Sequence, residues 1–198
     1  MESSQTLILA STSQIRKEIL TGAGIAFSVR VGDVDEDALK RSLPGKPVDE
    51  LATLLALAKA NAVVKKPNEL IIGADQIMEM DGELFDKPKT MKEAKQRLLD
   101  MRGREHCLVG AVVVVQENHE NWVHVSTTKL FMRDFSESFI DEYLALEGEK
   151  LLYSVGAYMF EARGAQLFEW VKGDFYSILG LPLLPLLSHL RSRGALQI

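Results

Sequence analysis

The sequence contains one cysteine, Cys107, among 198 residues, so no disulfide can form within the chain. A lone cysteine is typical of proteins from a reducing compartment. No apolar run approaches the ~20 residues of a membrane span, and the stretch Met1-Glu2-Ser3-Ser4-Gln5 lacks the basic start of a secretory signal. We therefore expect a cytoplasmic protein with no membrane partner.

An excess of basic residues is also missing. The chain has 23 Lys and Arg against 28 Asp and Glu, which gives a net charge of -5 at pH 7. General binding of nucleic acid depends on clustered basic side chains that neutralise phosphates, so we expect no nucleic-acid partner, although a local basic pocket remains open. With 46% hydrophobic residues, the chain is long enough for a single domain, 1–198, of two close lobes.

Several catalytic motifs are absent as well. The sequence has no Walker lysine loop, no G-x-S-x-G elbow and no Cys or His cluster at zinc spacing. Its four histidines lie in separate segments and look structural. A site on this chain must therefore be assembled from residues that are far apart in sequence.

The hydrophobic pattern predicts an α/β fold. Apolar and β-branched runs indicate strands, and apolar stripes at helical spacing indicate helices. Parallel units come first and an antiparallel hairpin later, so we expect an elongated mixed β-sheet flanked by helices, with a central cleft between two lobes. The expected strands are 6–10, 26–31, 70–80, 104–116 and 122–133, and the expected helices are 15–23, 48–64, 90–101, 136–146 and a Leu-rich helix within 173–190.

The strand that begins at Leu70 ends at an acidic residue that could take part in catalysis. Its apolar run stops at Gly73 and is followed by Ala74, Asp75 and Gln76. A buried strand that ends in Asp can hold a carboxylate rigidly at the sheet edge where ligands of open α/β sheets bind. Asp75 is thus the first candidate for chemistry, and a turn or capping role is the alternative.

Hydroxyls and cations suited to phosphate lie on other turns. Ser11 and Ser13 precede a helix that carries Arg16, and a helix N-terminus favours anions, although capping alone accounts for at least one hydroxyl. Lys59 and Lys87 could add charge against a triphosphate, while each cation taken alone is equally a solvated surface residue. An acidic turn at 32–37 contains Glu36, which with Asp75 supplies the oxygen ligands that Mg²⁺ prefers.

The chain resembles the Maf (septum formation inhibitor) family nearly end to end. The matching motifs, in the family's order, are Leu9-Ala10-Ser11-Thr12-Ser13 with Arg16, Val34-Asp35-Glu36, Ala58-Lys59-Ala60, Gly73-Ala74-Asp75, Lys87-Pro88, Gly156-Ala157-Tyr158 and Gly180-Leu181-Pro182-Leu183. The resemblance implies a fold like that of inosine triphosphate pyrophosphatases. It also implies hydrolysis of a nucleoside triphosphate between the α- and β-phosphates, a divalent metal (Mg²⁺ or Mn²⁺) and a possible homodimer.

Carried over by position, the resemblance makes Asp75 the proton acceptor. The phosphate and metal shell is then Ser11, Arg16, Glu36, Lys59 and Lys87. Mg²⁺ and the three cations would stabilise charge that develops on the phosphates, and Asp75 would orient or deprotonate water.

Three positions bear on the nucleotide base. Gln76 and Glu161 match the branch that resembles 7-methyl-GTP pyrophosphatase, and a carboxylate at 161 can accept hydrogen bonds from a guanine edge. Ile15 stands where that branch has Trp, so the ~0.5–2 kcal/mol of cation–π attraction to a methylated guanine is missing. Gln14 replaces the family's usual Pro, which an early helical position does not require.

We therefore expect a pyrophosphatase for non-standard or modified nucleotides, leaning towards 7-methyl-GTP. The alternatives are a dTTP/UTP pyrophosphatase and a largely non-catalytic, nucleotide-binding regulator of cell division. The joint presence of Asp75, Glu36, Lys59 and Lys87 favours catalysis, because a pure binder does not need all four.

Overall fold

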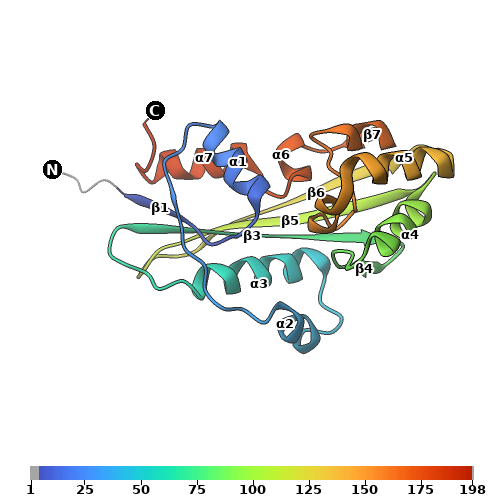
Figure 1. Cartoon of the computed structure of the whole chain (residues 1–198). Helices are drawn as coiled ribbons and strands as arrows, with labels where there is room; N and C mark the ends of the chain where they lie inside the picture. The colour runs from blue at the N-terminus through green and yellow to red at the C-terminus, as the bar shows by residue number, and fades with distance from the viewer. Residues whose placement is uncertain (1–4, 198) are drawn as a thin grey trace. The chain divides into compact units, whose positions relative to one another are not determined.

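The computed structural model describes residues 5–197, and its strands form one mixed sheet in the order β2-β1-β3-β5-β6-β7, with β4 paired to β3 (Figure 1). The expected α/β class is confirmed. The strands are β1 (Thr6–Leu9), β2 (Ser28–Val29), β3 (Glu69–Met80), β4 (Glu83–Phe85), β5 (Glu105–Val115), β6 (Trp122–Met132) and β7 (Phe168–Lys172).

Two of the expected helices begin at a side-chain cap. Thr90 and Ser136 accept hydrogen bonds from the amides of Glu93 and Phe139, and these caps start two of the expected helices. The α-helices are α1 (Gln14–Gly22), α2 (Glu36–Ser42), α3 (Val48–Asn61), α4 (Met91–Met101), α5 (Glu137–Glu147), α6 (Phe175–Ile178) and α7 (Leu183–Ser192). The 3-10 helices are η1 (Gly148–Tyr153) and η2 (Arg163–Leu167).

The chain divides into two compact units. Unit 1 comprises residues 1–76, 109–126 and 175–198, and unit 2 comprises residues 77–108 and 127–174. Strands β3, β5 and β6 contribute residues to both units. The single domain with a central cleft stays a prediction.

Unit 1 contains the parallel strands. β1 pairs in parallel with β2 and with β3, and Ile8 lies opposite Ser28 on one side and Ile71 on the other. Helices α1 and α7 cover one face of this part of the sheet and α3 covers the other (Figure 1). Because both faces are covered, β3 is buried continuously from Glu69 to Asp75, as parallel strands usually are.

Unit 2 is built on antiparallel pairs. β4 pairs with the end of β3 through a hairpin whose turn residues, Asp81 and Gly82, have φ values of 54° and 83°. Positive φ at both central residues is typical of the two-residue turn that an Asp-Gly pair predicts. β6 pairs with β7, with Leu130 opposite Val171.

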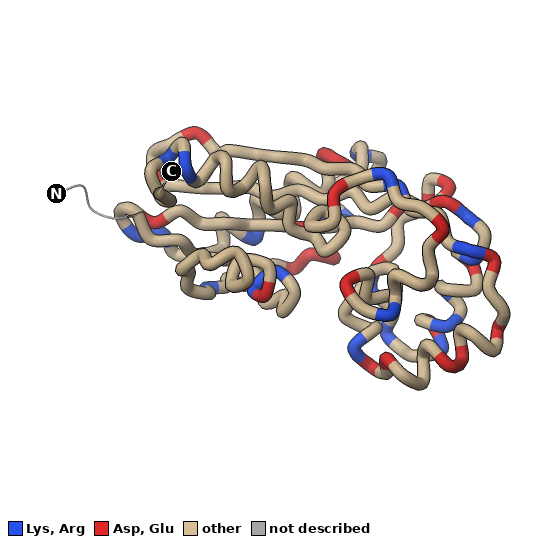
Figure 2. Tube along the Cα trace, turned by 90° about the horizontal axis from the view of Figure 1, so that it is seen from above, with Lys and Arg blue, Asp and Glu red and all other residues tan. Residues whose placement is uncertain are grey.

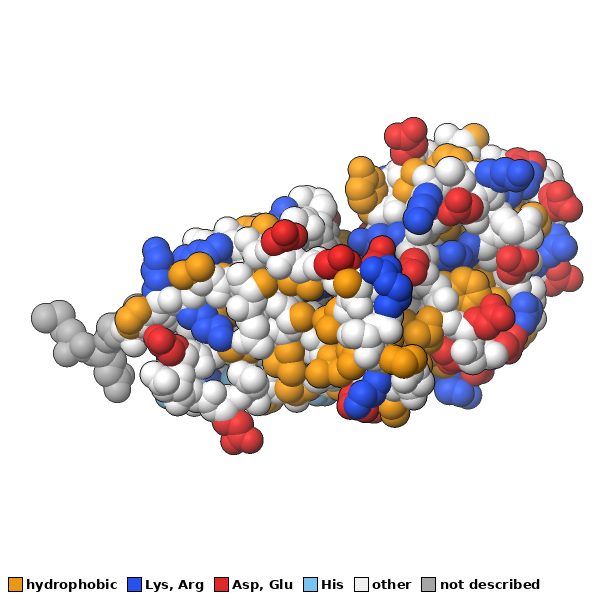
Figure 3. Space-filling model, turned by 90° about the horizontal axis from the view of Figure 1, so that it is seen from below, with side chains coloured by type: hydrophobic (Ala, Val, Ile, Leu, Met, Phe, Trp, Pro, Cys, Tyr) orange, Lys and Arg blue, Asp and Glu red, His pale blue; other side chains and the backbone are white. Residues whose placement is uncertain are grey.

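Basic and acidic residues are interspersed along the chain trace in Figure 2 and over the molecular face drawn in Figure 3.

Some elements differ from expectation. The segment predicted as an acidic turn contains α2, which begins at Glu36 after its N-cap residue Asp35 accepts a hydrogen bond from the amide of Ala38 at 2.8 Å. No residue of α2 is buried, so the segment has no apolar stripe by which a helix is recognised. The strand expected at 26–31 shrinks to Ser28–Val29, while β7, α6, η1 and η2 were not anticipated.

Between residues 5 and 197, none of the helices combines the length and the apolar character needed to cross a membrane. Residues Met1 to Ser4, which contributed to the expectation of no signal segment, lie outside the described part.

Candidate active site

The approach of α3 to β3 depends on Gly73. A Cβ at this position would lie 2.4 Å from the carbonyl oxygen of Ala56 and 2.9 Å from Cβ of Ala60, both on α3. Only a residue without a side chain lets the helix pack this closely. This close packing brings Lys59, the residue before Ala60 on α3, next to Asp75, which lies two residues after Gly73 on β3.

Lys59 joins the two candidate acids. Its Nζ lies 2.6 Å from Oδ1 of Asp75 and 3.0 Å from Oε2 of Glu36. The Asp75 side chain is 9% exposed and that of Lys59 18%, whereas the Glu36 side chain at the start of α2 is 42% exposed. A buried carboxylate, a half-buried ammonium and an exposed carboxylate thus converge from β3, α3 and α2. The structure therefore brings these three residues together, and their roles stay predictions.

Arg16 is a buried cation of α1 that is held by backbone oxygens. Its Nε donates to the carbonyl oxygen of Gly180 at 2.8 Å, and its Nη1 donates to that of Ala74 at 2.9 Å. Burial lowers the pKa of the Arg16 guanidinium, and the carboxylates of Asp75 and Glu36 oppose this shift. A guanidinium stays protonated at neutral pH, so the site keeps a fixed positive charge within the field of both acids.

The serines of the β1–α1 turn differ in their contacts. Ser11 is buried, and its Oγ accepts hydrogen bonds at 3.2 Å from the amide of Ser13 and at 3.2 Å from Nη1 of Arg16. Ser13 is the N-cap residue of α1, and within residues 5–197 its hydroxyl makes no capping hydrogen bond. Ser11 therefore shapes the turn and orients Arg16.

Gln76 continues β3 directly after Asp75. Its Nε2 donates to the carbonyl oxygens of Ser177 at 2.8 Å and Ile178 at 3.2 Å. The side chain of Ile15, the third position expected to bear on the base, is half-buried and packs against the core cluster that includes Leu183 and Leu186.

Two expected site residues belong to unit 2. Lys87 is exposed and follows β4, and Glu161 is exposed in the turn that precedes η2. The chain turns at 160–162 before β7 begins, so Glu161 lies in a turn and not in a strand. The six residues Ser11, Arg16, Glu36, Lys59, Asp75 and Gln76 all lie in unit 1. Participation of Lys87 and Glu161 in their site stays a prediction.

A metal at this site would depend on few protein ligands. Within the described residues, no group of three or more His, Cys, Asp and Glu side chains is arranged to hold a metal ion. Glu36 and Asp75 nevertheless direct carboxylate oxygens at one shared cation, the ammonium of Lys59. Mg²⁺ is usually bound by one or two protein carboxylates, and water and phosphate oxygens fill its other coordination positions. Glu36 and Asp75 would suit such an ion.

The histidines have structural surroundings. His106 is buried, its Nε2 lies 2.9 Å from the hydroxyl of Tyr158, and burial lowers its pKa to about 4. His189 stacks on Trp122 with ring centroids 4.5 Å apart. Both imidazoles therefore have partners within the fold.

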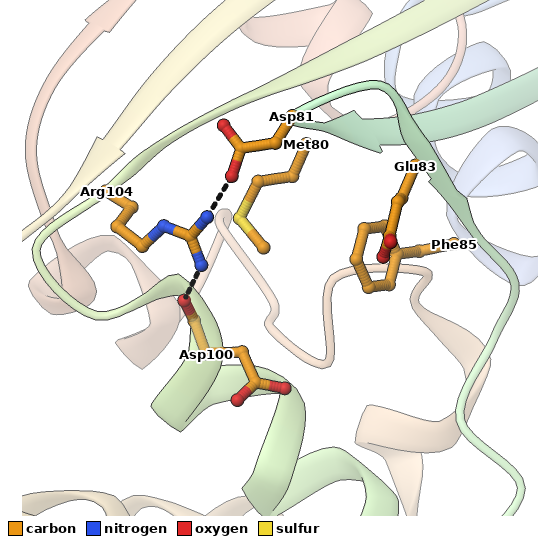
Figure 4. A pocket seen from close by; sticks show the side chains of 6 residues that line it. All are labelled: Met80, Asp81, Glu83, Phe85, Asp100 and Arg104. Carbon is orange, nitrogen blue, oxygen red and sulfur yellow. Dashed lines mark hydrogen bonds and ion pairs between the residues drawn. The ribbon is translucent and has the colours of Figure 1, made fainter.

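A hollow of about 260 Å³ lies within unit 2 beside the β3–β4 hairpin (Figure 4). Arg104 donates there to the carboxylate of Asp81 and, at 3.0 Å, to the carbonyl oxygen of Asp100. The guanidinium of Arg104 therefore already has hydrogen-bond partners within the protein. The residues expected to form the site do not line this hollow, which is bounded by Met80, Asp81, Glu83, Phe85, Asp100 and Arg104.

Sequence reasoning missed the backbone partners of the site. The carbonyl oxygens of Ala74, Ser177, Ile178 and Gly180 hold Arg16 and Gln76, and a carbonyl has no signature of its own in a sequence. The available signal was Gly180-Leu181-Pro182, since a glycine before a helix start often marks a special backbone conformation. Gly180 indeed has a φ of 88°.

Comparisons with known proteins show which family the sequence matches. A family model described as Maf-like protein matches residues 6–193. A 7-methyl-GTP pyrophosphatase from Rhizobium meliloti (strain 1021) is 46% identical over 96% of this chain and 98% of its own length. A nucleoside triphosphate pyrophosphatase from Granulibacter bethesdensis is 47% identical over 97% of this chain and 99% of its own. The Staphylococcus aureus Ham1 protein structure shows a weak likeness, with a TM-score of 0.41 and 18% identity over 66% of this chain and 73% of that one.

Proposed function

We propose that this chain, which belongs to the Maf-like protein family and is a nucleoside triphosphate pyrophosphatase, acts on non-standard or modified nucleotides and favours 7-methyl-GTP. The reaction would cleave the α–β phosphoanhydride and release the monophosphate and pyrophosphate. The observation that carries the proposal is the convergence of Asp75, Lys59 and Glu36 beside the buried guanidinium of Arg16.

Asp75 is the residue that would orient or deprotonate the attacking water. Its strand is buried on both faces, its Oδ1 is paired with the ammonium of Lys59, and a carboxylate is the group that would accept the proton. Lys59 can reach a phosphate oxygen from the same position, because an ammonium carries three donors on a flexible stem. Arg16 uses Nε and Nη1 for the protein, so Nη2 is the nitrogen through which it would meet a phosphate.

Glu36 and Asp75 are the residues that would hold the divalent cation. When bound, Mg²⁺ or Mn²⁺ would neutralise phosphate charge and make the α-phosphorus a better electrophile. The exposure of Glu36 leaves its second oxygen open to water or to a phosphate-bound ion. The family resemblance also assigns Lys87, a residue of unit 2, to the cations that would bind phosphate.

The leaning towards 7-methyl-GTP has two supports. The relatives from Rhizobium meliloti and Mesorhizobium japonicum are both named 7-methyl-GTP pyrophosphatase, and the latter is 43% identical over 98% of this chain. Glu161 is exposed, so its carboxylate is accessible to the donors of a guanine edge.

Ile15 supports a second candidate, dTTP/UTP hydrolysis. Its side chain packs partly into the core cluster and offers no aromatic surface on which a cationic base could stack. A pocket with this residue would favour a smaller, neutral base over a methylated guanine.

The discriminating experiment is a substrate panel at fixed Mg²⁺ or Mn²⁺ concentration. The panel contains 7-methyl-GTP, GTP, ITP, UTP and dTTP, with pyrophosphate and orthophosphate measured separately. The proposal expects pyrophosphate as the product and the highest kcat/KM for 7-methyl-GTP. Highest kcat/KM for UTP and dTTP selects the second candidate, and nucleotide binding without turnover selects a non-catalytic regulator.

A further inference from the structure

We propose that Gln76 is a positioning residue that, together with Arg16, clamps the backbone of Ser177–Gly180 onto the end of β3 next to Asp75. The two side chains come from β3 and α1, and their acceptors lie 101 to 164 residues further along the chain. All of these residues belong to unit 1. Gln76 would thus support the surroundings of Asp75 through the backbone it holds, without choosing among bases.

Both side-chain N–H groups of Gln76 are already used by the protein backbone. An amide nitrogen has two N–H groups, and those of Nε2 are directed at the carbonyl oxygens of Ser177 at 2.8 Å and Ile178 at 3.2 Å. A base that needs a donor from Gln76 would have to break one of these bonds. Oε1 faces Gly180, since a Cβ built there would lie 3.5 Å from it, at an ordinary van der Waals distance.

Arg16 fastens the same segment at its other end. Its Nε donates to the carbonyl oxygen of Gly180 at 2.8 Å, while Nη1 donates at 2.9 Å to that of Ala74, the residue before Asp75. One guanidinium therefore connects the strand that carries Asp75 to the segment that Gln76 holds. A planar fork of fixed donors suits this connection better than a lysine would.

The segment needs outside donors because α6 is so short. This helix spans Phe175–Ile178, and carbonyl groups at a helix C-terminus lack partners within the helix. The chain then turns at Gly180, whose φ of 88° favours glycine, and the amide of Leu181 donates to the carbonyl oxygen of Tyr176 at 3.0 Å. Gln76 and Arg16 supply donors to the carbonyl oxygens of Ile178 and Gly180, and Gln76 adds a second donor to that of Ser177, which already accepts from the amide of Gly180 at 3.1 Å.

The consequence for specificity rests on the proposed function. If Gln76 holds backbone, its replacement should disturb the surroundings of Asp75 for every nucleotide alike. If it instead contacts the base, its replacement should alter the preference among bases and leave the segment ordered. The two roles therefore differ in one structural and one kinetic measurement.

The test combines hydrogen exchange with kinetics on Gln76→Glu, which keeps the side-chain length but removes both donors. The amides of Leu179, Gly180 and Leu181 are bonded within the segment and report its order. The clamp predicts that their exchange accelerates about tenfold, as expected when buried acceptors lose their donors. It also predicts that kcat falls for 7-methyl-GTP, GTP, UTP and dTTP in the same proportion, with little change in KM.

Gln76→Thr provides a second variant without added charge, and the same acceleration is expected because Thr is too short to reach Ser177. Gln96→Glu is the matched control, since Gln96 is exposed on α4 and bonds only to Asp100 among the contacts described for its side chain. The control should leave exchange in the segment and turnover unchanged.

Unchanged exchange in Gln76→Glu and Gln76→Thr overturns the clamp, whether or not the base preference shifts. Accelerated exchange with an altered ratio of purine to pyrimidine kcat/KM overturns the purely positioning role of Gln76, because it shows that the side chain also acts on the choice of base. Accelerated exchange in a chain that hydrolyses none of the nucleotides supports the clamp and refutes the proposed function, so the two failures are distinguishable.

Discussion

Nζ of Lys59 lies 2.6 Å from Oδ1 of Asp75, so the candidate base and the candidate phosphate-binding cation form an ion pair. The same ammonium lies 3.0 Å from Oε2 of Glu36. Lys59 thus holds the position between two carboxylates that a divalent cation would use. The ammonium and the metal are expected to compete for these oxygens.

Lys59→Met should therefore separate metal affinity from turnover. Without the ammonium, Glu36 and Asp75 repel each other, and we expect the nucleotide-free protein to bind Mn²⁺ about tenfold more tightly, which corresponds to about 1.4 kcal/mol. Calorimetric titration of Mn²⁺ measures this change. Turnover should fall, because the charge that would meet the phosphates is lost.

Lys46→Met is the control for the loss of a lysine. Lys46, which precedes α3, forms an exposed ion pair with Glu50 four residues further on, and neither belongs to the candidate site. Its replacement should leave Mn²⁺ affinity unchanged. Weaker Mn²⁺ binding by Lys59→Met would show that the ammonium does not compete with the metal.

Asp75→Asn tests the proton acceptor. Asn keeps the size of Asp and can still accept a hydrogen bond from Lys59, so the fold and nucleotide binding should persist. Turnover should fall about 10²-fold or more, the usual contribution of a general base. Pyrophosphate release under saturating substrate measures kcat, and Asp141→Asn, at an exposed ion pair with Lys95, is the matched control. Retention of full turnover by Asp75→Asn would remove Asp75 from the reaction.

The strongest local signals of the sequence correspond to real elements. The apolar run before Gly73, the caps Thr90 and Ser136 and the Asp81-Gly82 turn each act through neighbours in sequence, so local reasoning finds them. Helix α2 was not predicted, because none of its residues is buried. A helix without an apolar face has no periodic signal.

The candidate site was only partly predictable for a different reason. Lys59 and Asp75 could be selected one by one, but their contact depends on the absence of a side chain at Gly73, which acts across space. Arg16 was expected to bind phosphate, and its bonds to two backbone carbonyls could not be anticipated from residue types. Backbone acceptors are present at every position, so composition does not distinguish them.

Gly73→Ala should disturb stability and turnover together. The new methyl group would lie 2.4 Å from the carbonyl oxygen of Ala56, which forces α3 away from β3 and takes Lys59 with it. We expect the free energy of unfolding to fall by about 1–3 kcal/mol, as is usual for an overpacked core, and kcat to fall as well. Urea unfolding measures the first effect.

Gly22→Ala is the glycine control, because a Cβ there would meet nothing within 4 Å at the end of α1. The free energy of unfolding should stay the same or rise by about 0.5–1 kcal/mol, since alanine loses less conformational entropy in a helix. A Gly73→Ala protein as stable and active as the parent would refute the role assigned to the α3–β3 contact.

Glu161→Gln tests the expected guanine contact. A neutral amide oxygen accepts hydrogen bonds less strongly than a carboxylate, so kcat/KM for guanine nucleotides should fall about tenfold and that for UTP much less. The control is Glu149→Gln, at another exposed position of unit 2. Equal losses on GTP and UTP would take Glu161 out of base recognition.

The burial of His106 predicts how the free energy of unfolding depends on pH. Burial lowers its pKa from 6.5 to about 4, so the folded protein keeps His106 neutral while the unfolded chain takes up a proton below pH 6.5. This contribution is fully present above pH 6.5 and is lost as the pH falls from 6.5 towards 4. The loss can reach about 1.4 kcal/mol per pH unit. His106→Gln, which can still bond to the hydroxyl of Tyr158, should flatten the dependence of the unfolding free energy between pH 7 and pH 5. His119→Gln, an exposed replacement, should retain the slope of the parent, and an equally steep slope for His106→Gln would assign the effect to other groups.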